Sequence, residues 1–358
     1  MGCRMPFAET YDILRGLALE LNKYKILNLY EADKHEWNDC VINSDLGYVY
    51  DFYEMVIECE YEQSCNLTFA IKDLRKNIII LIMPLFNRKS IWIDNAKQSP
   101  TFYCRSGPII RNGLNKQEKK EIKDIFLQNL TRLLELHKQT ELYVELAALC
   151  SYGFPKYNIV NPFIFWGFEP RIRYTWIVDL SKDEDTLFRN LNRTTRKSIK
   201  RISSQSIVYI RESFSNDINN DFEMFVSLSD ETYHRNGLLS KSRQYYWNQF
   251  HYVSSDKRRI FFLEKFEDGT PEAAMMVHLY NNTARVTWVV SANIKSKDVV
   301  RFLIYKVMIE LKSSGIGYIE IGGAYPYLPT TDKRRRISDF KKSFGGTLHP
   351  IYMGYLAL

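Results

Sequence analysis

The chain has 358 residues, of which 45% are hydrophobic and 14% aromatic, a composition typical of a well-packed globular protein and not of a disordered one. A single hydrophobic core stops growing below this length, so we expect two domains. The net charge of +7 is modest and favours phosphate-bearing partners, such as tRNA, nucleotide-linked sugars, coenzyme A or an anionic membrane face, without choosing among them.

Membrane-spanning, secreted and metal-dependent proteins carry sequence signals that this chain lacks. The longest apolar run, residues 78–86, is shorter than the ~18–20 residues of a membrane span and contains Pro84, which fits a buried strand. No secretory signal is visible at the start. The six cysteines form no C-x-x-C pair and the six histidines have no metal-ligand spacing, so we expect reduced thiols, no metal and a cytoplasmic location.

Helical and strand patterns alternate in the first half of the chain. Asn115 followed by Glu118 predicts a capping box that opens a long helix. In chain order we expect a helix over 7–22, a strand over 25–30, a helix over 34–41, a hairpin of strands 67–72 and 78–85, a strand over 103–110 broken at Gly107-Pro108, the long helix, and a strand over 141–149. This order indicates α/β or α+β architecture.

The second half repeats this order after an aromatic, proline-containing stretch at 151–170. Ser181 with Glu184 predicts a capping box that opens the most basic segment of the chain. The expected elements are a strand over 171–180, a helical region over 217–252, strands over 259–266, 272–280 and 285–291, a helix over 298–312, and a strand over 318–321. The repeated order predicts an internal duplication, with domains 1–165 and 166–358.

A helix near the C-terminus carries a lysine beside its apolar stripe. At ~100° per residue, Ile337, Phe340 and Phe344 share one face, and Gly345-Gly346 ends the helix before a strand over 347–356. Lys341 lies at the margin of that face, whereas Lys342 points to solvent. A lysine beside a buried face is costly unless an anionic or polar group meets it, which indicates a ligand. The alternative is an aliphatic stem that lies along the protein with its ammonium at the rim.

Basic residues between 189 and 201 recur at helical spacing. Counted from the first, they occupy positions i, i+4, i+7, i+8 and i+11, a spacing that predicts one basic helical face. The five residues are Arg189, Arg193, Arg196, Lys197 and Lys200. Five like charges on one face repel one another unless an anion is near, and arginine forks suit phosphate. A solvated basic face balanced by acidic residues elsewhere is the alternative.

Five segments occur in the order typical of one known family. They are Thr175-Trp-Ile-Val-Asp-Leu180, Leu191-Asn-Arg-Thr-Thr-Arg-Lys-Ser-Ile-Lys-Arg201, Thr232-Tyr-His-Arg-Asn-Gly237, Tyr318-Ile-Glu-Ile-Gly-Gly323 and Phe340-Lys-Lys-Ser-Phe-Gly-Gly346. Together they resemble the FemA/FemB/FemX family, relatives of the GNAT-type N-acetyltransferases. The resemblance covers residues 171–356, with Arg105-Ser-Gly-Pro108 similar to the family's Gly-Pro strand.

The resemblance implies an α/β (α+β) fold of two tandem GNAT-like domains, with mixed sheets flanked by helices. Family members transfer an aminoacyl group from aminoacyl-tRNA, or in sister groups an acyl group from a thioester, to an amine of a cell-wall or surface-glycan precursor. It also implies that Lys341 holds phosphate or the reacting carbonyl. The substrate-binding residues expected with it are Arg196, Lys200, Arg235, Tyr325, Tyr327 and Arg105.

Two departures from the family pattern bear on mechanism. No acidic residue follows Gly107-Pro108, where some members carry an aspartate proposed as the catalytic base. The identity of the base in this chain is therefore undecided, with Glu320 as one candidate and Asp339 as a weaker one. Residues 292–298 lack the glycine-rich pyrophosphate cradle of ordinary acetyl-CoA users, which favours aminoacyl-tRNA slightly over acyl-CoA as donor.

We therefore expect an N-acyltransferase with no bound cofactor, acting on a phosphorylated sugar or peptide acceptor. An acyl-CoA-dependent N-acetyltransferase of amino sugars is an alternative. A catalytically silent module that binds RNA or an anionic membrane is another. Contacts with tRNA and with a membrane surface are compatible with the charge, and DNA is not expected. The donor, the acceptor and the oligomeric state stay open at this level.

Overall fold

A computed structural model describes residues 23–58, 65–88, 91–93, 96–98, 101–104, 106–154, 160–205, 208–213, 217–251, 253–292 and 298–357. They form two compact units, one within Met1–Arg171 together with Tyr352–Leu358 and the other within Ile172–Ile351. The expected helix over 7–22 and the candidate Arg105 lie outside the described residues. No helix in the described part of the chain is long and apolar enough to cross a membrane.

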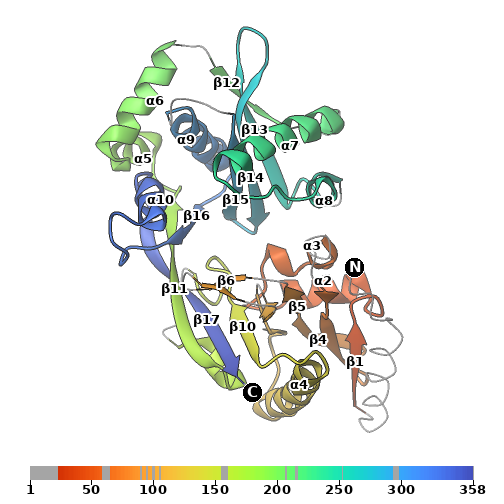
Figure 1. The fold of residues 1–358 in the computed structure, drawn as a ribbon. Helices are drawn as coiled ribbons and strands as arrows, with labels where there is room; N and C mark the ends of the chain where they lie inside the picture. The colour runs from red at the N-terminus through yellow and green to blue at the C-terminus, as the bar shows by residue number, and fades with distance from the viewer. Residues whose placement is uncertain are drawn as a thin grey trace. The chain divides into compact units, whose positions relative to one another are not determined.

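The first unit is a mixed α/β structure (Figure 1). One sheet has the strand order β1-β3-β4-β9, and β10 pairs in parallel with β8 and antiparallel with the end of β17. Its elements are β1 (Tyr24–Asn28), α2 (Lys34–Ile42), α3 (Tyr53–Glu58), β2 (Cys65–Asn66), β3 (Phe69–Asp73), β4 (Ile78–Met83), β5 (Phe86–Arg88), β6 (Ile91–Ile93), β7 (Ala96–Gln98), β8 (Thr101–Cys104), β9 (Ile109–Ile110), α4 (Lys116–Leu136) and β10 (Glu141–Glu145).

Most sequence predictions for this unit are confirmed. The hairpin is β3 and β4, which pair antiparallel, and the long helix is α4. Its capping box is present, because the Asn115 side chain accepts from the Glu118 N–H and the Glu118 carboxylate accepts from the Asn115 N–H. The predicted strand over 141–149 is shorter than expected and ends at Glu145.

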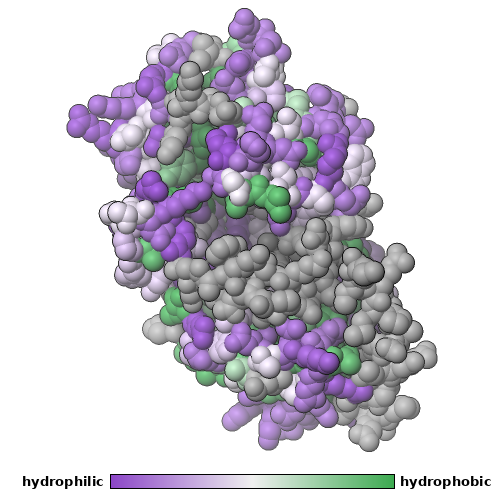
Figure 2. Space-filling view, viewed as in Figure 1, coloured by the Kyte–Doolittle hydropathy of each residue, from purple (hydrophilic) through white to green (hydrophobic). Residues whose placement is uncertain are grey.

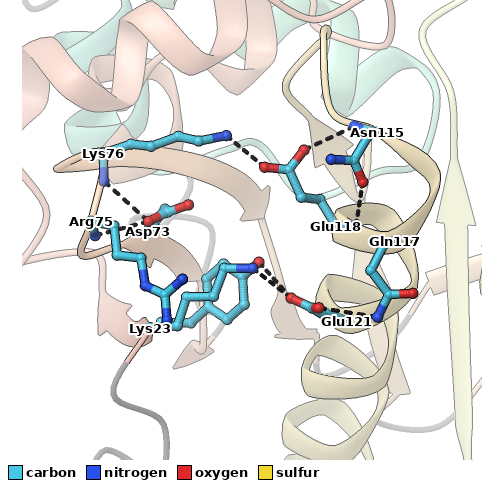
Figure 3. A network of polar contacts seen from close by, with 9 residues as sticks. Lys23, Asp73, Arg75, Lys76, Asn115, Gln117, Glu118 and Glu121 are labelled. Carbon is cyan, nitrogen blue, oxygen red and sulfur yellow. Dashed lines mark hydrogen bonds and ion pairs between the residues drawn. The ribbon is translucent and has the colours of Figure 1, made fainter.

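Ion pairs fix the start of α4 to the strands beside it (Figure 3). Glu118 pairs with Lys76 in the β3–β4 turn, and Glu121 pairs with Lys23 ahead of β1, each at 2.6 Å. The Tyr24 hydroxyl also donates to Glu121, at 3.1 Å. The hydrogen bond from Lys23 holds the pKa of Glu121 at about 2. Glu118 and Glu121 of this helix therefore face the sheet.

The second unit is an antiparallel sheet with one parallel pair, covered by helices on both faces (Figure 1). Its strand order is β12-β13-β14-β15-β16-β11, and only β15 and β16 run parallel within that order. Its elements are β11 (Glu169–Asp179), α5 (Glu184–Asn190), α6 (Arg193–Gln205), β12 (Val208–Glu212), α7 (Ile218–Arg235), α8 (Arg243–His251), β13 (Arg258–Lys265), β14 (Pro271–Tyr280), β15 (Thr283–Ser291), α9 (Asp298–Ser313), β16 (Tyr318–Ala324), α10 (Lys333–Lys342) and β17 (Thr347–Ala357).

Strand alternation divides the core of this unit into two layers. Met275 and Val277 pack with α6 and α9 on one face of the sheet, while Ala274 and Met276 pack with α7 and α8 on the other. Side chains of β13 and β14 are buried on both faces, which explains why these strands read as continuous apolar runs. Strand β12 was not predicted from the sequence.

Two predictions about the basic segment are wrong. Helix α5 is capped by Asp183, which accepts from the Thr186 N–H at 2.8 Å, and not by Ser181. Asn192 then caps a second helix, α6, by accepting from the Thr195 N–H at 2.7 Å. The break at Leu191-Asn192 separates Arg189 from the other basic residues, so the five do not share one helical face.

The two units differ from the predicted domains 1–165 and 166–358 at the end of the chain. Residues Tyr352–Leu358 belong to the first unit because β17 pairs with β10 there. The assignment of separate domains, and their origin by duplication, stay predictions.

Candidate functional site

The only parallel strand pair described in the second unit contains the candidate site. Strands β15 and β16 pair over three positions, from Thr283 opposite Tyr318 to Arg285 opposite Glu320, and then part. In α/β folds, ligands bind beyond the carboxyl ends of strands where neighbouring connections diverge. Glu320 therefore lies where these two strands separate.

Glu320 is a buried carboxylate whose hydrogen bonding is incomplete. Its side chain is 1% exposed. One oxygen, Oε1, accepts from the Thr175 hydroxyl at 2.9 Å. The other, Oε2, lies 3.4 Å from Arg285 Nε but has no hydrogen-bond partner among the described residues. A buried acceptor without a donor can receive a proton or an N–H from a bound substrate.

Lys341 supplies a cation close to this carboxylate. Its Nζ donates to the Gly323 carbonyl at 3.3 Å. Burial lowers the pKa of Lys341 to about 8, opposed by attraction to Glu320 and assisted by repulsion from Arg285 and Arg173. An ammonium has three donors, so this one retains capacity for a carbonyl oxygen or a phosphate.

Gly322 makes room for this ammonium. Its φ is +98°, a conformation that glycine adopts without strain. A Cβ at this position would lie 3.0 Å from Lys341 Nζ, and a side chain would therefore displace the lysine. The Gly322-Gly323 pair that ends the β16 motif thus has a steric role beside Lys341.

The inward side of helix α10 is mixed, and the sequence predicted it only in part: Phe344 is buried and Phe340 packs against the same core, as expected. Ile337 is 42% exposed, so its place in a buried stripe is wrong. Ser338 is fully buried instead, and Lys341 lies one turn further along on the same side. The predicted exposure of Lys342 and the end of the helix before Gly345-Gly346 are confirmed. Lys341 is half-buried and lies between Ser338 and Phe344 on the inward side of the helix.

Ser338 holds this orientation through two buried donors. Its Oγ accepts from Trp176 Nε1 at 3.1 Å and from the Tyr325 N–H at 3.0 Å. These bonds join α10 to β11 and to the loop after β16. The serine therefore fixes the side of the helix that presents Lys341.

We expect Ser338→Ala to lower the free energy of unfolding by about 2–4 kcal/mol, because two buried N–H groups lose their acceptor. Urea unfolding of Ser338→Ala, Trp176→Phe and the double variant measures this effect. The double variant should lose about 1 kcal/mol less than the sum of the single variants, since one bond is shared. Strict additivity would show that the Ser338–Trp176 contact contributes nothing.

Two predicted tyrosines lie in the loop beyond β16. Tyr325 is half-buried, and its hydroxyl lies 3.4 Å from a guanidinium nitrogen of Arg173. Tyr327 is 78% exposed, and its ring packs edge-on against Tyr174 with 5.8 Å between centroids. The hydrogen bond with Tyr327 raises the pKa of Tyr174. Since Arg173 also acts on the pKa of Lys341, Tyr325 belongs to the surroundings of the lysine.

The other described candidates make different contacts. Arg196 donates to the Arg189 and Leu191 carbonyls at the end of α5. Lys200 Nζ lies 5.8 Å from the centroid of the Phe188 ring. Arg235 donates to the Ser291 and Ala292 carbonyls at the end of β15, at 3.2 and 2.8 Å. None of the three contacts Lys341 or Glu320 in the described structure, and their roles in substrate binding stay predictions.

Sequence reasoning did not identify three residues of the cluster. Thr175 and Arg173 lie two residues apart on β11, and so on one face of that strand. Arg285 is the single charged residue of β15. A charged residue within a strand pattern could have indicated Arg285 from the sequence. That Glu320 lies opposite it follows only from the β15–β16 register.

No group of three or more potential metal ligands occurs among the described residues. The cluster consists of one carboxylate and three cations, Arg173, Arg285 and Lys341, around a position where two strands part. This arrangement suits a substrate with anionic or developing negative charge next to an amine.

Comparison with known proteins identifies the fold. The sequence matches no family model and no curated protein. The structure is similar to that of FemX, with a TM-score of 0.62 at 11% identity over 92% of this chain and 96% of that one. It is also similar to the C-terminal domain of a putative lysylphosphatidylglycerol synthetase from Agrobacterium fabrum, with a TM-score of 0.54 at 11% identity over 90% of each chain.

A third similar structure is N-myristoyltransferase of Saccharomyces cerevisiae with bound myristoyl-CoA. Its TM-score is 0.50 at 10% identity, over 94% of this chain and 79% of that one. The chain thus has the same fold as FemX and N-myristoyltransferase, and the GNAT-like α/β fold that the sequence resemblance implied is confirmed.

Proposed function

We propose that this chain, which has the tandem GNAT-like acyltransferase fold, is an N-acyltransferase. It joins an activated acyl or aminoacyl group to an amino group of a cell-wall peptide or surface-glycan precursor in the cytoplasm. The observation that supports this most directly is the pairing of Glu320, a buried carboxylate with an unsatisfied oxygen, with the nearby ammonium of Lys341.

The chemistry assigned to this pair is aminolysis of an ester or thioester. The acceptor nitrogen attacks the carbonyl carbon and forms the C–N bond, and the carbonyl oxygen becomes an oxyanion to which Lys341 donates. Glu320 Oε2 takes the proton from the nitrogen. The C–O or C–S bond then breaks, and that proton passes to the leaving alcohol or thiol.

The remaining candidates are assigned to the acceptor. Tyr325 and Tyr327 line its pocket, and the arginine and lysine side chains of Arg196, Lys200, Arg235 and Arg105 meet its phosphate groups. Orienting the amine and the carbonyl supplies most of the rate, since this reaction needs little covalent assistance from the protein.

Aminoacyl-tRNA is the donor we favour, because residues 292–298 have no glycine-rich cradle for a pyrophosphate. An acyl-CoA donor is the second candidate, supported by the myristoyl-CoA in the similar N-myristoyltransferase structure. The two donors differ in the group transferred and in the leaving group, an alcohol or a thiol, and the same cluster serves both.

Product analysis by mass spectrometry tests the proposal. The protein is incubated with charged tRNA or acyl-CoA and a panel of amino-sugar and peptide precursors, and we expect one donor to yield an amide. Glu320→Gln should lower the rate by about 10²–10⁴-fold because the proton acceptor is lost. No product from any donor, together with salt-dependent RNA or vesicle binding, would favour the non-catalytic alternative.

A further inference from the structure

A cluster of lysines occupies the N-terminal half of α4, in the first unit. Lys116, Lys119, Lys120 and Lys123 are spaced i, i+3, i+4 and i+7, which places them on neighbouring positions of the helix surface. The first three are exposed and Lys123 is half-buried. None of the four forms an ion pair with a carboxylate in the described structure.

The carboxylates of the same stretch are used elsewhere. Glu118 and Glu121 face the sheet and pair with Lys76 and Lys23, as Figure 3 shows. The third, Asp124, is exposed and has no ion pair within the described chain. Asp124 lies four residues after Lys120 and offsets one of the four charges, so the lysine cluster keeps a net positive charge.

This arrangement is unfavourable for the helix itself. Cations near a helix N-terminus oppose the macrodipole, and like charges at i and i+4, such as Lys116 with Lys120, repel. Both effects destabilise the helix unless an anion approaches the lysines. The cluster thus fits a binding role better than a structural one.

A groove of about 420 Å³ runs along the cluster, lined by Lys116, Gln117, Lys120, Lys123 and Phe165. Phe165 belongs to the 3-10 helix Pro162–Trp166 and is 44% exposed. The next residue, Trp166, is buried against Phe126 of α4, with 4.9 Å between ring centroids, and this contact fixes the 3-10 helix beside α4. Lys123 Nζ lies 5.2 Å from the Phe165 centroid.

We propose that this groove binds a single-stranded segment of nucleic acid. The lysines meet successive phosphates over the ~10 Å that separate positions seven residues apart in a helix, and the Phe165 ring stacks on a base. Figure 2 shows mainly hydrophilic described residues around α4, with small hydrophobic spots. A planar anionic bilayer does not enter a groove, whereas a strand of nucleic acid does, so the shape favours the strand.

Fluorescence anisotropy with a labelled uridine oligonucleotide of about 12 nucleotides tests this site. Binding is measured between about 50 and 200 mM salt. Contacts of Lys116, Lys120 and Lys123 with three phosphates should contribute about −2 to the slope of log K against log salt concentration. Lys120→Ala should weaken binding and make the slope less negative by about 0.7. Phe165→Ala should weaken binding about 10-fold with little change in slope.

Lys25→Ala is the matched control, because Lys25 is an exposed lysine of the same unit outside the groove; it should leave binding unchanged. Lys120→Ala should have an equal or higher melting temperature, since it removes repulsion and adds a strong helix former. Binding that neither Lys120→Ala nor Phe165→Ala weakens would overturn the proposal. So would Lys120-dependent sedimentation with phosphatidylserine vesicles in the absence of oligonucleotide binding.

Discussion

Replacing Lys341 by methionine should lower kcat/KM for acyl transfer by about 10²–10³-fold, the usual effect of removing one donor to a developing oxyanion. Methionine keeps the length of the side chain but removes the ammonium that donates to Gly323. Thermal unfolding should show a melting temperature equal to or above that of the wild type, because the substitution removes a cation whose pKa is lowered by burial. Steady-state kinetics and a melting curve on the same preparation measure both effects.

Lys342→Met is the matched control for this experiment. Lys342 is the next residue of α10 and is exposed, so its substitution removes the same charge outside the cluster. We expect near-wild-type turnover from it. Near-wild-type turnover from Lys341→Met as well would remove Lys341 from the mechanism.

The wild-type pH profile gives a second readout of the same residue. The charged ammonium is a much stronger donor to an oxyanion than the neutral amine, and the pKa of Lys341 is about 8, so this stabilisation falls as the pH rises above that value. A rate that stays constant from pH 7 to beyond the pKa would contradict an oxyanion role for Lys341.

The second large effect concerns the stability of the first unit. Asp51 closes the 3-10 helix Val49–Asp51 and is completely buried. Its Oδ2 accepts from the Tyr48 N–H at 2.8 Å, and its Oδ1 has no hydrogen-bond partner among the described residues. Burial raises the pKa of Asp51 from 3.8 to about 8, although hydrogen bonds from Ser106 and Tyr48 act in the opposite direction. Asp51 is therefore a neutral acid at pH 7.

The raised pKa makes the wild type less stable in alkali. The folded chain binds a proton at Asp51 that the unfolded chain has released above pH 3.8, so the free energy of unfolding falls as the pH rises from about 4 to about 8. The stabilisation from this proton is complete below pH 3.8 and is lost by pH 8. Its full size is on the order of 5 kcal/mol, from a shift of about four pKa units.

Asp51→Asn should remove this pH dependence, because asparagine has nearly the same shape as the neutral acid and cannot ionise. We expect the variant to be close to wild type in stability near pH 4 and more stable at pH 8, with a difference of about 5 kcal/mol at most. Urea unfolding at a series of pH values measures the two curves. Parallel curves for wild type and variant would show that Asp51 is not neutral in the folded protein.

Asp51 and Glu320 show that burial of a carboxylate does not by itself determine its role. Both carboxylates are buried and each has one oxygen without a hydrogen-bond partner in the described structure. Glu320 lies beside Arg285 and near Lys341, whereas the hydrogen bonds of Asp51 come from neutral groups. The first arrangement suits chemistry with a charged substrate, and the second mainly affects stability.

Local chemistry explains which elements could be predicted. The Asn115–Glu118 capping box, the hairpin of β3 and β4, and the end of α10 before Gly345-Gly346 depend on residues a few positions apart. The same reasoning failed for Ser181, because Asp183 was a competing cap two residues later. It also failed for the basic face, because Asn192 starts a new helix inside a run with helical spacing.

The inward face of α10 could not be obtained in this way. Hydrophobic periodicity favoured Ile337, but Ser338 is buried because Trp176 and the Tyr325 N–H need an acceptor there. The predicted stripe is buried at Phe340 and Phe344, where the partner surface is apolar, whereas two polar donors face Ser338 and Ile337 stays exposed. The position of Lys341 follows from that contact.

The sequence by itself determined the order of helices and strands in most of the described chain, the tandem GNAT-like fold that its motifs implied, and Lys341 and Glu320 as candidates. These depend on short-range spacing and on motifs within one element. Tertiary structure alone decided what surrounds them: Thr175 reaches Glu320 across 145 residues and Trp176 reaches Ser338 across 162. Strand register and helix packing bring such groups together. They also produce the burial that lowers the pKa of Lys341 and raises that of Asp51.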